Sequence, residues 1–119
     1  MTAPGTTTPG PSTVHTVLTR QLDALGRGDL DALLANYAAD AELLRSDGVF
    51  RGPERIRAAF ARYLALRPRL VELSECTESC DTLLYRAVLE LGGTRKEAIG
   101  TMVIRNGKIW RQTAGVFDG

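Results

Sequence analysis

The sequence predicts an α+β domain in which helices pack on one face of a curved sheet. Three segments in the first half of the chain carry apolar residues at helical spacing, and from Arg69 onward the pattern changes to strands. The pair Asn106-Gly107 separates the last two strands. A type I′ turn needs positive φ at both central residues, so this pair is typical of a two-residue hairpin. Helices followed by an antiparallel meander give the α+β class.

The composition indicates a single domain with one core. The chain has 119 residues, 44% hydrophobic and 24% charged, which is enough for one sizeable core and too short for two. Residues 1–11 are rich in Pro, Gly and Thr, so we expect a disordered lead-in followed by one domain over residues 12–119. Because 15 basic and 14 acidic residues are scattered along the chain, no basic stripe favours nucleic acid as a partner.

The sequence shows no signal of a membrane, metal or cofactor partner. No apolar run reaches the roughly 20 residues of a membrane span, and the N-terminus lacks a signal sequence, so we expect a cytoplasmic protein. Cys76 and Cys80 have three residues between them and no histidine nearby, which is at most half a metal site. We expect two reduced thiols at the end of a hairpin and, in the absence of a nucleotide or flavin motif, no cofactor.

The first predicted helix carries apolar residues at helical spacing from Val14 to Leu25, with Ser12 or Thr13 as its cap. Gln21 lies on or beside its apolar stripe. This position places a polar side chain near the predicted core.

The second predicted helix begins at an Asp29 cap and presents an apolar face that ends with Tyr37. Asp40 is expected to close this helix, and residues 41–45 to form the first strand. Tyr37 then stands at the corner between helix and strand.

The third predicted helix opens at Gly52-Pro53, because proline is favoured at the first helical position, and Pro68 stops it. Its apolar face consists of Ile56, Phe60, Tyr63 and Leu64. The remaining strands are predicted over residues 70–76, 82–91, 95–105 and 108–117.

Two segments carry a resemblance to a known group of proteins: GDLDALLANYAADA (28–41) and GVFRGPERIRAAF (48–60). With the order of elements, they resemble the nuclear-transport-factor-2-like superfamily, which includes SnoaL-type cyclases and ketosteroid isomerases. The resemblance covers residues 12–117 and implies a cone-shaped α+β barrel around a small-molecule pocket. Its members include isomerases, cyclases, dehydratases, epoxide hydrolases and proteins without catalysis, so the activity depends on the pocket residues.

The resemblance assigns the catalytic positions of the ketosteroid isomerases to residues that cannot carry out that reaction. The proton-shuttling carboxylate falls on Arg45, the helix tyrosine on Gln21 and the later acid on about Gly100. A guanidinium stays protonated, so Arg45 cannot act as that base. Asp47, two residues further on, is the available substitute.

Two other branches of the superfamily are matched in part. Limonene-epoxide-hydrolase-like members resemble this chain at Arg86 and Trp110, but their acids are replaced here by Val88 and Gln112. SnoaL-type cyclases often use a histidine, and the one histidine is His15, in the first turn of the first helix.

Strand parity taken from the family turns Arg86, Val88 and Glu90 into the pocket from one strand, and Trp110, Gln112 and Ala114 from the last. The catalytic candidates are Arg45, Asp47, Arg86, Gln112 and Tyr37. The candidates for contacting the ligand are Gln21, Phe60, Tyr63, Val88, Glu90, Met102 and Trp110.

These residue types suit acid–base chemistry on a carbonyl compound. An arginine, a glutamine and a tyrosine hydroxyl stabilise an enolate oxygen, while Asp47 or Glu90 takes the proton. In the alternative, the arginines pair with these carboxylates and do no chemistry, and Tyr37 and Trp110 belong to the core.

The leading functional hypothesis is a cofactor-independent enzyme of secondary metabolism that isomerises, cyclises or dehydrates an apolar, ring-containing or polyketide-like carbonyl compound. One alternative is a non-catalytic binder of an apolar small molecule in the same pocket. Another is an interaction module, since relatives commonly form homodimers through the outer sheet face. An enzyme needs a cavity carboxylate without a permanent arginine partner, whereas an interaction module would have a filled interior.

Overall fold

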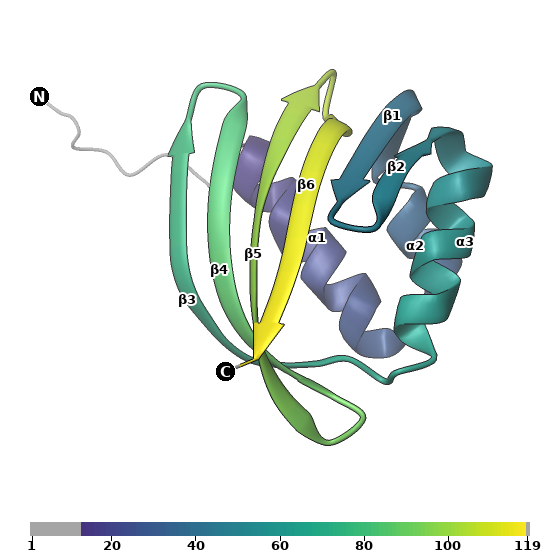
Figure 1. Ribbon diagram of the computed structural model, residues 1–119. Coiled ribbons are helices and arrows are strands. Elements are labelled where there is room, and N and C mark those ends of the chain that lie inside the picture. Colours follow the sequence, from purple (N-terminus) through teal and green to yellow (C-terminus); the bar gives the residue numbers. More distant parts are fainter. Residues whose placement is uncertain (1–12, 119) are drawn as a thin grey trace, which may run out of the picture.

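The computed structural model describes residues 13–118, which form three helices and six strands (Figure 1). The elements are α1 (Thr13–Arg27), α2 (Leu30–Leu34), β1 (Tyr37–Arg45), β2 (Gly48–Arg51), α3 (Gly52–Leu64), β3 (Arg69–Ser79), β4 (Thr82–Leu91), β5 (Thr94–Arg105) and β6 (Lys108–Asp118). The predicted disordered segment 1–11 and the predicted Ser12 cap lie outside the described residues.

The six strands form one open sheet in the order β2-β1-β6-β5-β4-β3. The pair β1 and β6 is parallel and every other neighbouring pair is antiparallel. The α+β class is therefore confirmed, but the sheet is mixed rather than wholly antiparallel, and it does not close into a barrel. A parallel pair needs a long crossover, which α3 and the three-stranded meander between β1 and β6 provide.

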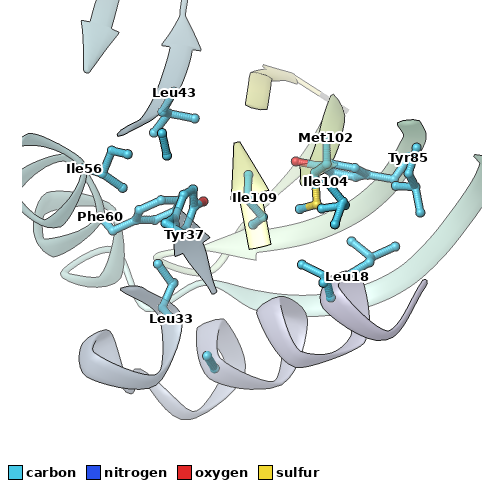
Figure 2. Packing of buried hydrophobic residues seen from close by; sticks show 14 of the residues in the cluster. Leu18, Leu33, Tyr37, Leu43, Ile56, Phe60, Tyr85, Met102, Ile104 and Ile109 are labelled. Carbon is cyan, nitrogen blue, oxygen red and sulfur yellow. The ribbon is translucent and has the colours of Figure 1, made fainter. Parts of the chain in front are cut away.

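The helices lie on one face of the sheet and enclose the core with it. Helix α1 packs against β3, β4 and β5, and α3 packs against β1 and β2 (Figure 1). The most deeply buried large apolar side chains are Leu18, Leu33, Leu43, Ile56, Leu83, Met102 and Ile109. Figure 2 shows Tyr37 beside Phe60 in this core, with 5.9 Å between the ring centroids.

The second helix is shorter than predicted. Asp29 caps it as expected, because its side chain accepts a hydrogen bond of 3.0 Å from the Ala32 N–H. The helix ends at Leu34, however, and Tyr37 and Asp40 belong to β1. The prediction that the helix extends to Tyr37 was wrong. Tyr37 is instead the first residue of β1, where it pairs with Ile109, and a strand position buries its side chain as a helix position would have done.

The strands of the meander follow the sequence pattern closely. β4 has the predicted bounds, while β3, β5 and β6 differ from prediction by one to three residues at their ends. Asn106 and Gly107 have φ of 54° and 76°, which confirms the two-residue turn with positive φ. The short strand β2, antiparallel to β1, was not predicted.

A bulge in β6 changes which side chains face the helices. Ile104 pairs with Ile109, but Val103 pairs with Arg111, so Trp110 is an extra residue without a partner on β5. Ile109 and Gln112, three positions apart, are consequently both buried. Strict alternation would have placed them on opposite faces.

Candidate functional site

A cavity of about 430 Å³ lies between the helices and the sheet. Its volume is in the range of small-molecule sites, roughly 300–1,000 Å³. Apolar side chains from α1, α3 and the strands make up most of its wall, among them Leu18, Leu22, Leu43, Ala59, Phe60, Ala87, Leu89, Ala98, Met102 and Ala114. The predicted wall residues Phe60, Tyr63 and Met102 all line it.

Four polar side chains form a buried chain of hydrogen bonds at the floor of this cavity. Asn36 Nδ2 donates to Gln21 Oε1 at 3.1 Å, and Gln21 Nε2 donates to the Tyr37 hydroxyl at 2.8 Å. The Tyr37 hydroxyl then donates to Gln112 Oε1. Gln21 and Gln112 line the cavity, whereas Tyr37 lies behind them and does not. The catalytic candidate Tyr37 is therefore separated from the cavity by the two glutamines that it contacts.

The Tyr85 phenol lines the cavity from β4, beside Gln112. Burial raises the pKa of this phenol, and an interaction with the Gln112 side chain partly opposes the increase. The Tyr85 hydroxyl is therefore protonated at neutral pH and can donate a hydrogen bond at the cavity wall.

The tyrosines of the site are neutral hydrogen-bonding groups at neutral pH. Burial raises the pKa of Tyr37 well above its usual value, with a smaller contribution from Tyr85. Burial likewise raises the pKa of Tyr63 to about 12. Each phenol therefore keeps its proton at neutral pH and is not a base there.

Charged side chains lie on the cavity wall contributed by α3 and the turn between β1 and β2. Arg45 Nε and Nη2 lie 3.0 and 2.6 Å from the two carboxylate oxygens of Asp47, and the guanidinium is 5.1 Å from the centre of the Phe50 ring. The hydrogen bond from Arg45 lowers the pKa of Asp47, and Arg62 adds to this effect. Asp47 is thus an ionised, paired carboxylate.

The structure does not bring the second predicted arginine to the cavity. Arg86 lies on the opposite face of β4, where its Nη2 is 2.9 Å from Glu97 and its Nη1 is 3.6 Å from Glu75. These carboxylates raise its pKa further. Glu90, on the same face, pairs with Arg69 at 2.7 Å, and Val88 also fails to line the cavity.

The predicted parity of β4 was therefore wrong, and the residues that face the cavity are Tyr85, Ala87, Leu89 and Leu91. The parity came from matching Arg86 to an arginine of the family. The strand itself carried a better signal, because the inward positions are apolar apart from one tyrosine, whereas the outward positions include Arg86 and Glu90. That alternation would have identified Tyr85.

Trp110 also lies away from the cavity, because the bulge turns it outward. Its ring contacts two guanidinium groups, with the Cζ atoms of Arg105 and Arg111 at 3.5 and 3.9 Å from the ring centre. The indole Nε1 is buried without a hydrogen-bond partner among the described residues. The inward orientation predicted for Trp110 was wrong, while that predicted for Gln112 and Ala114 is confirmed.

Gly100 provides the space that Tyr85 occupies. A Cβ atom at this position would lie 2.7 Å from the Tyr85 hydroxyl oxygen and 2.4 Å from the Thr113 carbonyl oxygen. The resemblance assigned about this position to the acid of the ketosteroid isomerases. Here a phenol from the neighbouring strand reaches over the glycine and places its hydroxyl at the cavity.

Three further predicted features lie away from the cavity. His15, in the first turn of α1, does not line it. Cys76 in β3 and Cys80 in the following turn are exposed free thiols.

Residues 13–118 contain no group of three or more side chains that could hold a metal ion. None of the helices in that range is long and apolar enough to cross a membrane.

Comparisons with known structures agree on this fold. An NTF-2 like protein of unknown function from Burkholderia xenovorans LB400 is 19% identical, with a TM-score of 0.79 over 90% of this chain and 84% of that one. A proposed polyketide cyclase from Sinorhizobium meliloti is 25% identical, with a TM-score of 0.73 over 83% and 93% of the two chains. A proposed ketosteroid isomerase from Kribbella flavida DSM 17836 is 14% identical, with a TM-score of 0.77 over 90% and 79%.

No curated protein matches the sequence significantly. The sequence profile of the SnoaL-like domain does match, over residues 18–112, which include α2, α3 and the cavity residues Gln21, Tyr85 and Gln112. The chain therefore belongs to the SnoaL-like domain family.

Proposed function

We propose that this protein binds an apolar, ring-containing small molecule in the cavity and holds one carbonyl or hydroxyl oxygen of that molecule at the floor. Most of the wall is apolar and the cavity is not filled by side chains, unlike the interior expected of a pure interaction module. The observation that carries the proposal is the buried, protonated Tyr85 hydroxyl, which belongs to a residue lining an otherwise mostly apolar cavity. A ligand carbonyl would accept a hydrogen bond from this hydroxyl.

The binding test uses N-phenyl-1-naphthylamine, a neutral probe whose fluorescence rises in an apolar site. The wild-type protein should bind it, and Ala114→Phe, which places a ring in the cavity, should reduce binding at least tenfold. Val103→Phe is the matched control, because it adds the same ring on the opposite sheet face. Circular dichroism verifies that both variants fold. Equal binding by the two variants would place the probe outside the cavity and contradict the proposal.

The role of Tyr85 is tested by competition between two ligands of the same shape. 2-Acetylnaphthalene carries a carbonyl oxygen, and 2-ethylnaphthalene lacks it. A buried hydrogen bond contributes about 1 kcal/mol, so the wild-type protein should prefer the ketone about fivefold. Tyr85→Phe should remove this preference and leave the binding of 2-ethylnaphthalene unchanged. A preference that survives in Tyr85→Phe would exclude this hydroxyl as the donor.

A second candidate function is the acid–base enzyme suggested by the family. The observation in its favour is that Asp47 lies on the cavity wall, where it could accept a proton from a carbon next to a ligand carbonyl. The electron pair would move to the carbonyl oxygen, and Tyr85 would donate a hydrogen bond to the resulting enolate. Its pairing with Arg45 makes Asp47 a weak base, so ligand binding is the better supported function.

This candidate is tested by following deuterium incorporation beside the carbonyl of 2-tetralone in D₂O by NMR. An enzyme should accelerate the exchange, and Asp47→Asn should abolish the acceleration. Glu90→Gln is the control, since Glu90 is a paired carboxylate on the other face of the sheet. Exchange at the rate of buffer alone would leave binding as the function.

We also propose that a second copy of the chain covers the outer face of the sheet. This face carries the exposed apolar side chains Leu44, Leu84, Ile99 and Phe117, of which Phe117 is 58% exposed. Burial of these side chains would stabilise a dimer through the hydrophobic effect. Light scattering after size exclusion should give the mass of a dimer for the wild-type protein and of a monomer for Ile99→Glu. A monomeric wild type at micromolar concentration would refute the dimer.

A further inference from the structure

The charged residues of the cavity wall are not balanced. Among the described residues that line the cavity, only Arg45, Asp47 and Arg62 are charged. Asp47 accounts for one positive charge through its two-pronged contact with Arg45. The positive charge of Arg62 is then not balanced by a carboxylate of the cavity wall. The charged side chains of the wall therefore have a net charge of +1.

Arg62 has no carboxylate partner among the described residues. It lies in the last turn of α3 and is exposed, and its positive charge contributes only weakly to lowering the pKa of Asp47. Arg57 of the same helix is paired with Asp31 at 2.6 Å, whereas Arg55, like Arg62, forms no salt bridge to the described residues. Arg62 differs from Arg55 because it also lines the cavity.

We infer that the ligand is an apolar anion, with its ring system in the cavity and one carboxylate or similar anionic group at Arg62. This inference rests on the proposed binding function and specifies its ligand class. A guanidinium offers paired N–H donors that match the geometry of a carboxylate. Since Arg62 is exposed, the ligand anion keeps part of its hydration and pays little desolvation cost there.

The interior of the cavity suits the ring system of such a ligand but not its anionic group. Its deeper wall contains Gln21, Gln112 and Tyr85 as polar residues and no charged side chain. An anion has no countercharge there, whereas a ring carrying a carbonyl or hydroxyl finds apolar contacts and hydrogen-bonding groups. The anionic group is thus directed to Arg62 and the neutral oxygen to Tyr85.

The test is displacement of N-phenyl-1-naphthylamine by two competitors of the same size, 2-naphthoate and 2-naphthamide. Exposed ion pairs contribute up to about 1 kcal/mol, so the wild-type protein should bind the carboxylate about three- to fivefold more tightly than the amide. Arg62→Gln should abolish this preference, as measured by the ratio of the two competitors' affinities for the same variant. High salt should reduce the preference of the wild type.

Arg55→Gln serves as the matched control, because Arg55 is an exposed arginine of the same helix that does not line the cavity. It should retain the full preference for 2-naphthoate. An unchanged preference in Arg62→Gln, or no preference in the wild type while the neutral probe binds, would overturn the inference and leave the binding function intact. Absence of probe binding to the wild type would refute the binding function and, with it, the inference.

Discussion

Replacing Tyr37 with phenylalanine should destabilise the fold by about 2–4 kcal/mol. The hydroxyl of Tyr37 is buried and accepts from Gln21 Nε2 while it donates to Gln112 Oε1. Its removal leaves one donor and one acceptor without a partner, in side chains that are 2% and 4% exposed. An unsatisfied buried group costs about 1–3 kcal/mol, and water that entered the cavity beside the glutamines would reduce the combined cost of the two groups.

Urea unfolding followed by circular dichroism measures this free-energy change, and Tyr63→Phe is its matched control. Tyr63 contacts the same Phe60 ring but makes no hydrogen bond to the described residues, so its replacement should cost less than about 0.5 kcal/mol. Tyr37→Phe should fold and still bind the neutral probe, because Tyr37 does not line the cavity. Equal stability of the two variants would refute the argument that the Tyr37 hydroxyl links the two glutamines.

Three other predictions concern individual side chains. Gly100→Ala should destabilise the fold by about 1–3 kcal/mol in thermal unfolding, because its Cβ would lie 2.4 Å from a backbone oxygen; an unchanged melting temperature would contradict this crowding. All three tyrosine pKa values are raised, so absorbance at 295 nm should show little phenolate in the folded protein at pH 10, whereas the urea-unfolded chain is about half ionised; equal ionisation would exclude the burial effect. Arg45 lowers the folded-state pKa of Asp47, so this pair stabilises the fold above about pH 4, the usual pKa, and loses its effect as the pH falls through the lower folded value. Urea unfolding across this range should show that the stability difference between wild type and Asp47→Asn disappears at low pH, and a difference that persists there would argue against the pair.

Local patterns in the sequence were sufficient to predict much of the fold. The Asn106-Gly107 turn determined the last hairpin, and apolar spacing identified the face of α3 that carries Phe60 and Tyr63. These signals depend on residues within one element or one turn, where backbone preference and amphipathic period act directly. The class of fold and part of the cavity wall followed from them.

The floor of the cavity could not be predicted in the same way. Tyr37 and Gln112 are 75 residues apart in the sequence, and no local pattern indicates that their side chains meet. The ion pairs of Arg86 depend on the register between β3, β4 and β5, which the sequence left open. Tyr85 was missed because a single arginine matched to the family outweighed the apolar alternation of the whole strand.

The bulge at Trp110 has a consequence for transferring functional roles between relatives by alignment. Before the bulge the odd-numbered Ile109 faces the core, and after it the even-numbered Gln112 and Ala114 do. A homologue without this extra residue, aligned without a gap, would have each later position of the strand assigned to the opposite side of the sheet. An alignment column that holds a cavity residue in one protein would then hold a surface residue in the other. Comparing catalytic residues across the family thus requires the gap to be placed at this bulge.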